Sequence, residues 1–238
     1  MEDTFRDIKC MLNAKFPLLY LVTSEYSRVT QKLRKIAFEE DYEFHTWDCV
    51  DFLRTHKKNQ SNRLEAVVAH DESDSTEDCE SLLKYLHEGL AKSEDNRKEI
   101  FVVEDFHKYF DREKVVVGLR KLSSEMKKLN KHIIFLSPSY QLPEEIEKYV
   151  TVVSMPLPDR KDLELRLRSI YDGELDEDLK KYIIDAALGL TDTEAELAFR
   201  LANEKVGLNT REASQIIANE KEQIIKKSGI LDYIQVNL

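Results

Sequence analysis

Two adjacent carboxylates, Glu104 and Asp105, come directly after a short apolar run near the middle of the sequence. A carboxylate pair at the end of a buried strand can hold hydrated Mg²⁺ and orient an attacking water for phosphoryl transfer, as a Walker B strand does. The usual order is Asp followed by Glu, and here that order is reversed. Because acidic strand ends are also common as plain solvated termini, the pair predicts a degenerate Walker B-like position without activity of its own.

Phosphate chemistry would also need a loop that surrounds the phosphates with backbone N–H groups. Such a loop carries a Gly-Lys-Ser/Thr triplet, and none of the six glycines stands in one: Gly89, Gly118, Gly173, Gly189, Gly207 and Gly229. Where the loop would follow the first apolar run, Ser24 and Glu25 begin a helical pattern instead. The Glu25 carboxylate would take the place of an anion at the positive end of the helix dipole. Ser24 and Glu25 therefore mark a degenerate P-loop position, and we expect this chain alone not to hydrolyse ATP.

A metal site is the main alternative chemistry. His107 follows Glu104 and Asp105 closely, so these three residues could serve a nucleotide- or metal-dependent hydrolase with a non-standard site. No second segment supplies matched ligands, and Ser137 lacks the Gly-x-Ser-x-Gly setting of a nucleophilic serine. We therefore expect no catalytic residue, no bound cofactor and no metal in this chain, and we keep the hydrolase as the alternative.

Composition narrows the possible partners. Hydrophobic residues make up 42% of the chain and charged residues 34%, which is typical of a globular protein. The formal net charge of -10 disfavours nucleic acid as a partner.

The three cysteines, Cys10, Cys49 and Cys79, are far apart in the sequence, which predicts free thiols. No apolar run approaches the roughly 20 residues of a membrane helix, and the N-terminus lacks the apolar core of a signal peptide. We expect a cytoplasmic protein without membrane contact.

The elements that would position these residues alternate between strands and helices through the first two thirds of the chain. Short apolar runs predict buried strands at 17–23, 43–47, 99–105, 132–137 and 149–154. Helical spacing of apolar residues predicts helices at 3–14, 24–40, 79–91, 111–130 and 144–148, with Ser24 and Asp111 as caps. Residues 48–80 are polar and have the weakest secondary-structure pattern in the chain, and we interpret them as an insertion or surface excursion. This order predicts an α/β fold with a mostly parallel, doubly covered sheet.

Strand patterns stop after residue 155, and four helical patterns follow near 159–172, 176–188, 192–205 and 210–227. Thr191 and Glu194 have the spacing of a capping box. The sequence therefore predicts an α/β domain at 1–156, a small all-helical lid subdomain at 157–229 and an exit linker at 230–238.

Several stretches carry a resemblance to a known family: KFPLLYLVT (15–23), IFVVEDFH (100–107), IFLSPS (134–139), LPEEI (142–146), MPLPDR (155–160), ALGLT (187–191) and EKEQIIKKSGIL (220–231). In this order and spacing they resemble the N-terminal lobe of the two-lobed AAA-type ATPases encoded in algal chloroplast genomes and in many bacteria. The resemblance covers nearly the whole chain except about 54–80.

The resemblance implies a degenerate AAA-like module that is followed, in the family, by a catalytic AAA module holding ATP and Mg²⁺. Glu104 and Asp105 fall on the Walker B position, and Ser137 falls near the sensor position. This chain ends where the second module would begin, so we expect the parent protein, and not this chain, to hydrolyse ATP.

The functional hypothesis is a catalytically silent domain that positions, regulates or recruits a partner for an adjoining ATPase module. The expected partners are that module, another protein or further copies of the chain. A clamp-loader-like subunit that handles DNA is a further alternative, which the acidic charge disfavours.

Overall fold

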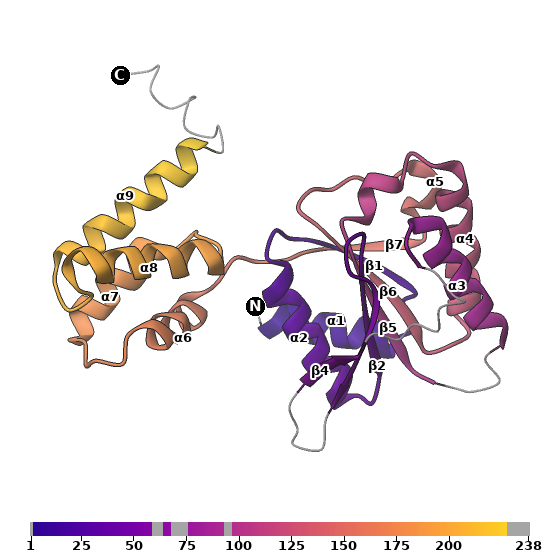
Figure 1. Ribbon diagram of the computed structural model, residues 1–238, viewed down its shortest axis with the longest axis horizontal. Coiled ribbons are helices and arrows are strands. Elements are labelled where there is room, and N and C mark those ends of the chain that lie inside the picture. Colours follow the sequence, from indigo (N-terminus) through magenta and orange to yellow (C-terminus); the bar gives the residue numbers. More distant parts are fainter. Residues whose placement is uncertain (1, 59–63, 68–75, 93–96, 228–238) are drawn as a thin grey trace. The chain divides into compact units, whose positions relative to one another are not determined.

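A computed structural model describes residues 2–58, 64–67, 76–92 and 97–227 of the 238-residue chain (Figure 1). The chain forms two compact units, Glu2–Met155 and Pro156–Leu238, which are described separately below. The exit linker expected at 230–238 lies outside the described residues.

The first unit is built on a seven-stranded sheet in the order β4-β3-β2-β5-β6-β1-β7. Its strands are β1 (Leu18–Val22), β2 (Glu43–Asp48), β3 (Phe52–Lys58), β4 (Leu64–Val67), β5 (Glu99–Glu104), β6 (Lys131–Ser137) and β7 (Val150–Ser154). Five of them, from β2 to β7 along the sheet, run parallel. The antiparallel strands β3 and β4 extend the sheet beyond β2. The interpretation of 48–80 as a surface excursion is therefore wrong for these two strands.

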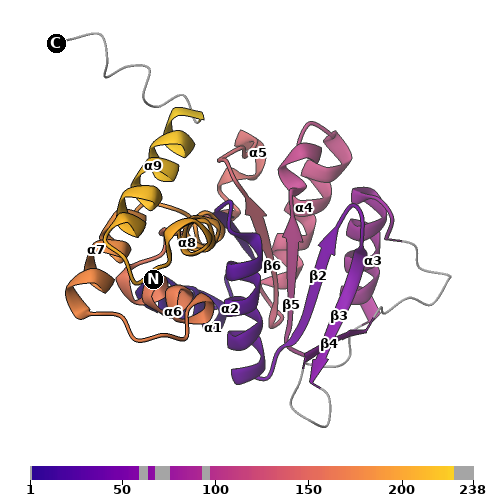
Figure 2. The same cartoon turned by 60° about the vertical axis from the view of Figure 1, so that its left-hand side comes forward.

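Helices cover both faces of this sheet, as Figures 1 and 2 show. On one face lie α1 (Glu2–Asn13) and α2 (Tyr26–Glu39), and on the other lie α3 (Cys79–Lys92), α4 (Glu113–Met126) and the single turn α5 (Glu144–Glu147). All seven residues of β6 are buried, and so are four of the five residues of β1. Strands covered on both faces need apolar residues without alternation, which explains the apolar runs in the sequence. The predicted α/β fold is confirmed.

Two predicted helix starts are wrong. Ser24 is exposed, and α2 begins at Tyr26 with Glu25 in the N-cap position. Asp111 does not cap α4, which begins at Glu113 after an extended Arg112. Neither N-cap side chain accepts a hydrogen bond from its helix. A 3-10 turn, η1 (Phe106–Tyr109), lies between β5 and α4, in a stretch for which the sequence predicted no helix or strand.

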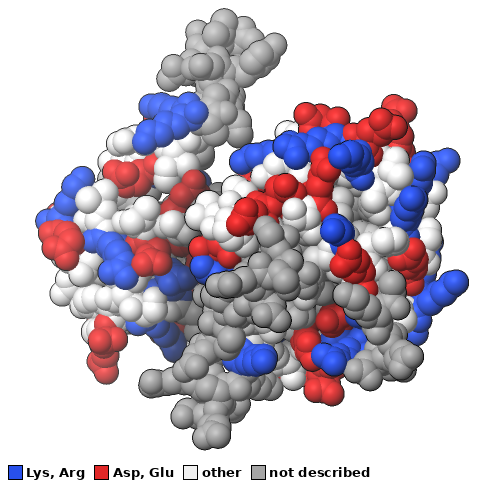
Figure 3. Space-filling view, turned by 45° about the vertical axis from the view of Figure 1, so that its right-hand side comes forward, with Lys and Arg blue, Asp and Glu red and all other residues white. Residues whose placement is uncertain are grey.

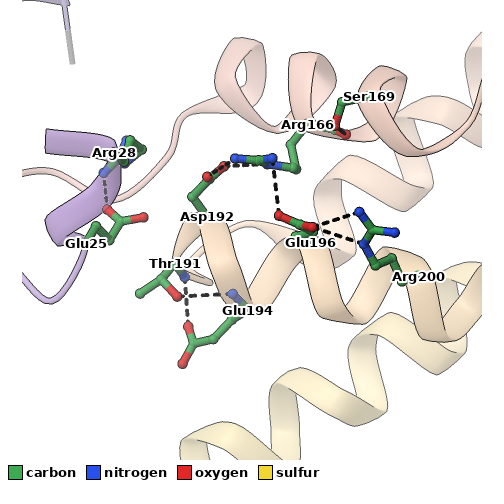
Figure 4. Close-up of polar contacts among 9 residues, drawn as sticks. All are labelled: Glu25, Arg28, Arg166, Ser169, Thr191, Asp192, Glu194, Glu196 and Arg200. Atoms are coloured by element: carbon green, nitrogen blue, oxygen red, sulfur yellow. Dashed lines mark hydrogen bonds and ion pairs between the residues drawn. The ribbon is translucent and has the colours of Figure 1, made fainter. Parts of the chain in front are cut away.

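The second unit is a bundle of α6 (Arg160–Ile170), α7 (Glu177–Ala187), α8 (Asp192–Val206) and α9 (Glu212–Lys227). Its core includes Leu163, Ile183, Phe199 and Ile217, all fully buried. The capping box that the sequence predicts at Thr191 and Glu194 starts α8, and Figure 4 shows both of its hydrogen bonds. The predicted helical part is thus confirmed.

Charged side chains fix two of these helices to each other. Arg166 of α6 donates from Nε to Asp192 of α8 at 3.0 Å and lies 3.2 Å from Glu196, which also pairs with Arg200 (Figure 4). Asp159 and Asp162 form a second capping box at the start of α6.

No helix among the described residues is long and apolar enough to cross a membrane.

Candidate functional site

The carboxyl ends of β1, β5 and β6 meet at one edge of the sheet, where ligands bind in open parallel α/β folds. The connection from β1 to α2 crosses this edge and consists only of Thr23, Ser24 and Glu25. The Thr23 N–H donates to the Ser137 carbonyl at 2.7 Å, and the Glu25 N–H donates to Thr23 Oγ1 at 2.9 Å. Two backbone donors of this short turn therefore already have partners inside the protein.

Glu25 lies where the sequence places it, at the N-terminus of α2. The carboxylate forms an ion pair with Arg28 one turn further along the helix (Figure 4). Both side chains are largely buried, with exposed fractions of 5% for Glu25 and 11% for Arg28. Glu25 thus has its countercharge on the same helix, and its side chain accepts no hydrogen bond from the first turn of α2.

The two carboxylates of the Walker B-like position point to different partners. Tyr26 donates from its hydroxyl to Asp105 Oδ1 at 2.6 Å, and Lys108 lies 3.5 Å from Asp105 Oδ2. Thr30 donates to Glu104 at 3.5 Å, a long hydrogen bond. Burial, followed by the charge of Asp48, raises the pKa of Glu104. Asp105 itself has a left-handed backbone with φ of 55°, a conformation in which Asp is more common than most residues.

Ser137 is fully buried at the end of β6 and forms a hydrogen bond with His107. Its hydroxyl donates to the Ser139 carbonyl at 2.9 Å and lies 2.9 Å from His107 Nδ1. Since the hydroxyl has one proton and uses it on the carbonyl, Nδ1 must carry a proton and donate to Ser137. Burial lowers the pKa of His107, which favours this neutral ring. Sequence reasoning named both residues but missed their contact, because they lie on separate segments.

This arrangement does not resemble a nucleophilic triad. In a triad the two ring nitrogens of the histidine face different partners, the serine and the acid. Here His107 Nδ1 faces both Ser137 at 2.9 Å and Asp105 at 3.9 Å, and the serine is closed off from solvent. The contacts are those of a hydrogen-bonded structural cluster.

The structure groups potential metal ligands elsewhere. Among the described residues, one group of His, Cys, Asp and Glu side chains has its ligand atoms within 4.8 Å of one another. The group consists of Glu43, His45 and Glu99. They occupy the amino ends of β2 and β5, at the opposite edge of the sheet. Glu104, Asp105 and His107, the alternative metal ligands in the sequence, do not form such a group. Glu43 and His45 share one strand face, as alternate residues do, but no sequence signal linked them to Glu99.

Comparison with protein families gives two adjoining matches. Residues 4–155 match the N-terminal domain of SpoVK-like AAA ATPases, and residues 158–228 match the second domain of the same ATPases. Together these two matches cover most of the chain and meet near the boundary between its two compact units.

Curated relatives include uncharacterised AAA domain-containing proteins called ycf46. The protein from Trieres chinensis is 23% identical over 95% of this chain, and the protein from Pyropia yezoensis is 22% identical over 96% of it. The alignments cover only 43% and 44% of those relatives. The chain therefore spans less than half the length of the curated relatives it matches.

Solved structures with a similar fold have little sequence in common with the chain. Domain III of the Thermotoga maritima replication initiation protein DnaA has a TM-score of 0.53 at 12% identity, covering 92% of this chain and 91% of that one. Caenorhabditis elegans PCH-2 has a TM-score of 0.52 at 9% identity, with coverage of 94% and 69%. Drosophila ORC, solved bound to DNA, gives 0.53 at 13%, with coverage of 100% and 73%. These likenesses show an AAA-type fold and nothing further.

Proposed function

Because this chain belongs to the SpoVK-like AAA ATPase family, we propose that it is a catalytically silent AAA-like region that positions, regulates or recruits partners for an adjoining ATPase module. The module would be the part of the longer relatives that this chain does not match. In this proposal the chain itself uses no cofactor, and ATP and Mg²⁺ belong to that other module.

The observation that carries the proposal is the three-residue connection between β1 and α2. A P-loop needs about eight residues, including two glycines and a lysine, to surround a phosphate with backbone N–H groups. Thr23, Ser24 and Glu25 supply neither the length nor the glycines. The buried pair of Glu25 and Arg28 adds a carboxylate at the point that an anionic phosphate would approach.

Contacts at the Walker B-like position support the same proposal. Tyr26, the first residue of α2, donates its hydroxyl proton to Asp105, and this contact joins the P-loop position to the Walker B-like position. The hydrogen bond from Tyr26 thus takes up one acceptor position of Asp105 that a water of hydrated Mg²⁺ would otherwise use.

A role in protein association agrees with the charge distribution. On the face drawn in Figure 3, basic and acidic side chains of the described residues are interspersed. The net charge of -10 of the whole chain favours protein partners over nucleic acid. Candidate partners are the adjoining ATPase module, another protein or further copies of this chain, since degenerate modules can keep their packing surfaces.

Nucleotide binding is tested by the melting temperature of the chain with and without Mg-ATP at about 1 mM, alongside a P-loop ATPase as positive control. We expect a clear rise for the control and none for this chain. A saturable rise that disappears in the Asp105→Ala variant would contradict the proposal and place a nucleotide at the Walker B-like position.

The positioning role is tested in a longer relative, the ycf46 protein of Trieres chinensis. We expect removal of the region that aligns with this chain to change ATP hydrolysis or the oligomeric state, measured by phosphate release and light scattering. The removed region, added back as a separate polypeptide, should partly restore the original ATP hydrolysis or oligomeric state if its surfaces bind the rest of the protein without a covalent link. Unchanged hydrolysis and unchanged assembly after removal would contradict the proposal.

The alternative function is a metal-dependent hydrolase that uses Glu104, Asp105 and His107. The observation in its favour is that perturbed carboxylates at the carboxyl edge of a parallel sheet often belong to active sites, and the pKa of Glu104 is raised. A Mg²⁺ or Mn²⁺ titration decides between the two. A melting shift lost in Asp105→Ala but kept in Glu99→Gln would favour the hydrolase.

A further inference from the structure

Two carboxylates stand directly opposite each other at the amino edge of the sheet. Glu43 and Glu99 are the first residues of β2 and β5, and they are register partners in this parallel pair. Like charges at directly opposed positions of a sheet repel each other and destabilise it. A pair of this kind gains stability when a cation lies between or beside the carboxylates.

His45 lies on the same face as Glu43, two residues further along β2. Its ring stacks on Phe101 with 4.5 Å between the ring centroids and an interplanar angle of 13°. Its Nδ1 atom lies 2.9 Å from Thr55 Oγ1 on β3. These two contacts fix the ring, so Nε2 faces Glu99 Oε1 at a distance of 3.8 Å.

The Nε2 atom of His45 is buried and has no hydrogen-bond partner within the described part of the chain. The residue as a whole is only 5% exposed. A buried polar atom without a partner costs free energy, so such an atom in a folded protein calls for an explanation. A lone pair on Nε2, facing a carboxylate oxygen, is suited to receive a positively charged group.

We propose that Glu43, His45 and Glu99 form a binding site for a divalent transition-metal ion, with Zn²⁺ as the best match. One imidazole nitrogen and carboxylate oxygens are a donor set that Zn²⁺ accepts in proteins. Two ligand atoms at about 2.1 Å from one zinc ion lie about 3.4 Å apart in a tetrahedral site. The 3.8 Å between Nε2 and Glu99 Oε1 needs only a small contraction to reach that geometry.

The surroundings of the ring meet further requirements of a metal site. Coordination through Nε2 requires the proton on Nδ1, which then donates to Thr55 Oγ1, and such a second contact orients a histidine ligand. Burial lowers the pKa of His45, which keeps the ring neutral and able to bind a cation near neutral pH. Glu43 is exposed, so an ion and its waters can enter from that side.

Two basic residues lie near the carboxylates and compete with the ion. Lys131, the register partner of Glu99 on β6, forms an ion pair with Glu99 Oε2, which leaves Oε1 for the side facing His45. Arg97 lies 3.9 Å from Glu43 Oε1, and both side chains are about half exposed. An exposed pair of this kind contributes little stability and yields readily to a metal ion. Neither contact supplies a partner for Nε2.

The site is tested by calorimetric titration with Zn²⁺ and by Co²⁺ absorption spectra, in a Cys10→Ser, Cys49→Ser background that removes the two exposed thiols. We expect one saturable ion per chain, a melting temperature that rises with the ion, and the spectrum of a low-symmetry Co²⁺ site. The variants His45→Gln and Glu99→Gln should weaken binding at least about tenfold.

The control variant is His56→Gln. His56 lies on the neighbouring strand β3 and contacts Thr46 Oγ1 at 2.8 Å, but it is outside the group of Glu43, His45 and Glu99. Its replacement should leave the affinity for Zn²⁺ within about twofold. The variant Lys131→Met, which removes the competing ammonium, should show a larger melting shift with Zn²⁺ than the parent protein.

Glu43→Gln keeps the test decisive if the buried variants fail to fold, because this side chain is exposed and its loss should be tolerated. It should also bind Zn²⁺ about tenfold more weakly. The proposal is overturned if the chain with His45, Glu43 and Glu99 intact binds no ion below roughly 1 mM. It is also overturned if Glu43→Gln and His45→Gln bind Zn²⁺ as tightly as His56→Gln.

Discussion

The two edges of the sheet in the first unit differ in how their polar groups are satisfied. At the carboxyl edge, the side chains of Tyr26, Asp105, His107 and Ser137 are joined to partners within the protein. At the amino edge, Glu43 opposes Glu99, and His45 keeps a buried nitrogen without a partner in the described residues. At the edge where parallel sheets commonly bind ligands, these side chains are therefore joined to one another, whereas at the opposite edge a buried histidine nitrogen faces a carboxylate without a hydrogen bond.

At the carboxyl edge the connection from β1 to α2 is short, and a largely buried ion pair and a tyrosine hydrogen bond lie beside it. In the proposed function these three features stand where a P-loop would hold a nucleotide. Single substitutions at the two edges should therefore differ in their effect on stability.

The largest effect is expected for Lys131→Met at the amino edge. Lys131 and Glu99 are 7% and 15% exposed, so loss of the ammonium leaves a mostly buried carboxylate without its partner. The free energy of unfolding should fall by about 3 kcal/mol, as measured by urea denaturation. The double variant Lys131→Met, Glu99→Gln should recover most of this loss. A single variant as stable as the parent would show that Glu99 is well solvated.

Acidification should also weaken the amino edge. Burial lowers the pKa of His45 to about 4, whereas an unfolded histidine has a pKa of about 6.5. Between these values the unfolded state binds a proton that the folded state does not, so stability falls as the pH falls. From pH 7 to pH 5 this one group should reduce the free energy of unfolding by about 2 kcal/mol.

The measurement is urea denaturation at several pH values for the parent protein and for His45→Gln. The variant should lose less stability over this pH range, and the remaining slope should reflect carboxylates and the other buried histidines. Equal slopes for the two proteins would mean that His45 titrates normally.

At the carboxyl edge, Ser137→Ala should cost roughly 1–2 kcal/mol of unfolding free energy. The change removes the acceptor of the His107 Nδ1 proton and one donor to the Ser139 carbonyl, in a place closed to solvent. Chemical denaturation measures the loss, and Ser154→Ala at the exposed end of β7 is the matched control, which should change little. Equal stabilities for the two variants would remove the structural role assigned to Ser137.

The smallest effect is expected for Tyr26→Phe, which should lower the unfolding free energy by about 0.5–1 kcal/mol. Its hydroxyl bonds Asp105, whose side chain is 43% exposed and can turn to water instead. Burial raises the pKa of Tyr26, so the hydroxyl keeps its proton at ordinary pH. The variant should still show no melting shift with Mg-ATP. A melting shift of this variant with Mg-ATP would mean that the hydrogen bond between Tyr26 and Asp105 keeps the nucleotide from binding.

Most of the architecture follows from the sequence because buried parallel strands have an unmistakable composition. The runs around Leu18, Phe101 and Ile134 become β1, β5 and β6 with ends close to those predicted. The capping box at Thr191 is also a local signal, since it needs only residues within one turn of helix.

Features that depend on neighbouring segments escaped prediction. Ser24 and Asp111 have the residue type of an N-cap, but the chain enters each helix one or more residues later. Strand β3 has a largely polar sequence because it lies toward the side of the sheet, where apolar runs are not required, and β4 is only four residues long. Phe52, the first residue of β3, has a φ of 57° directly after the tight turn that returns the chain from β2.

The candidate sites show the same limit. Glu104 and Asp105 stand next to each other in the sequence, so their shared edge could be predicted. The group of Glu43, His45 and Glu99 exists only because β2 and β5 pair in one particular register. Without that register, His45 is an unremarkable histidine in a strand.

The position of β1 has a consequence for the synthesis of the protein. Leu18 pairs with Ile133 on one side and with Val150 on the other, so the strand made first needs neighbours that the ribosome adds more than a hundred residues later. Until then its apolar run is a nascent segment without a sheet to join, and contacts between residues so distant in sequence form slowly. During this interval the apolar strand of the newly made chain is exposed to aggregation, unless the helices and strands made in between cover it.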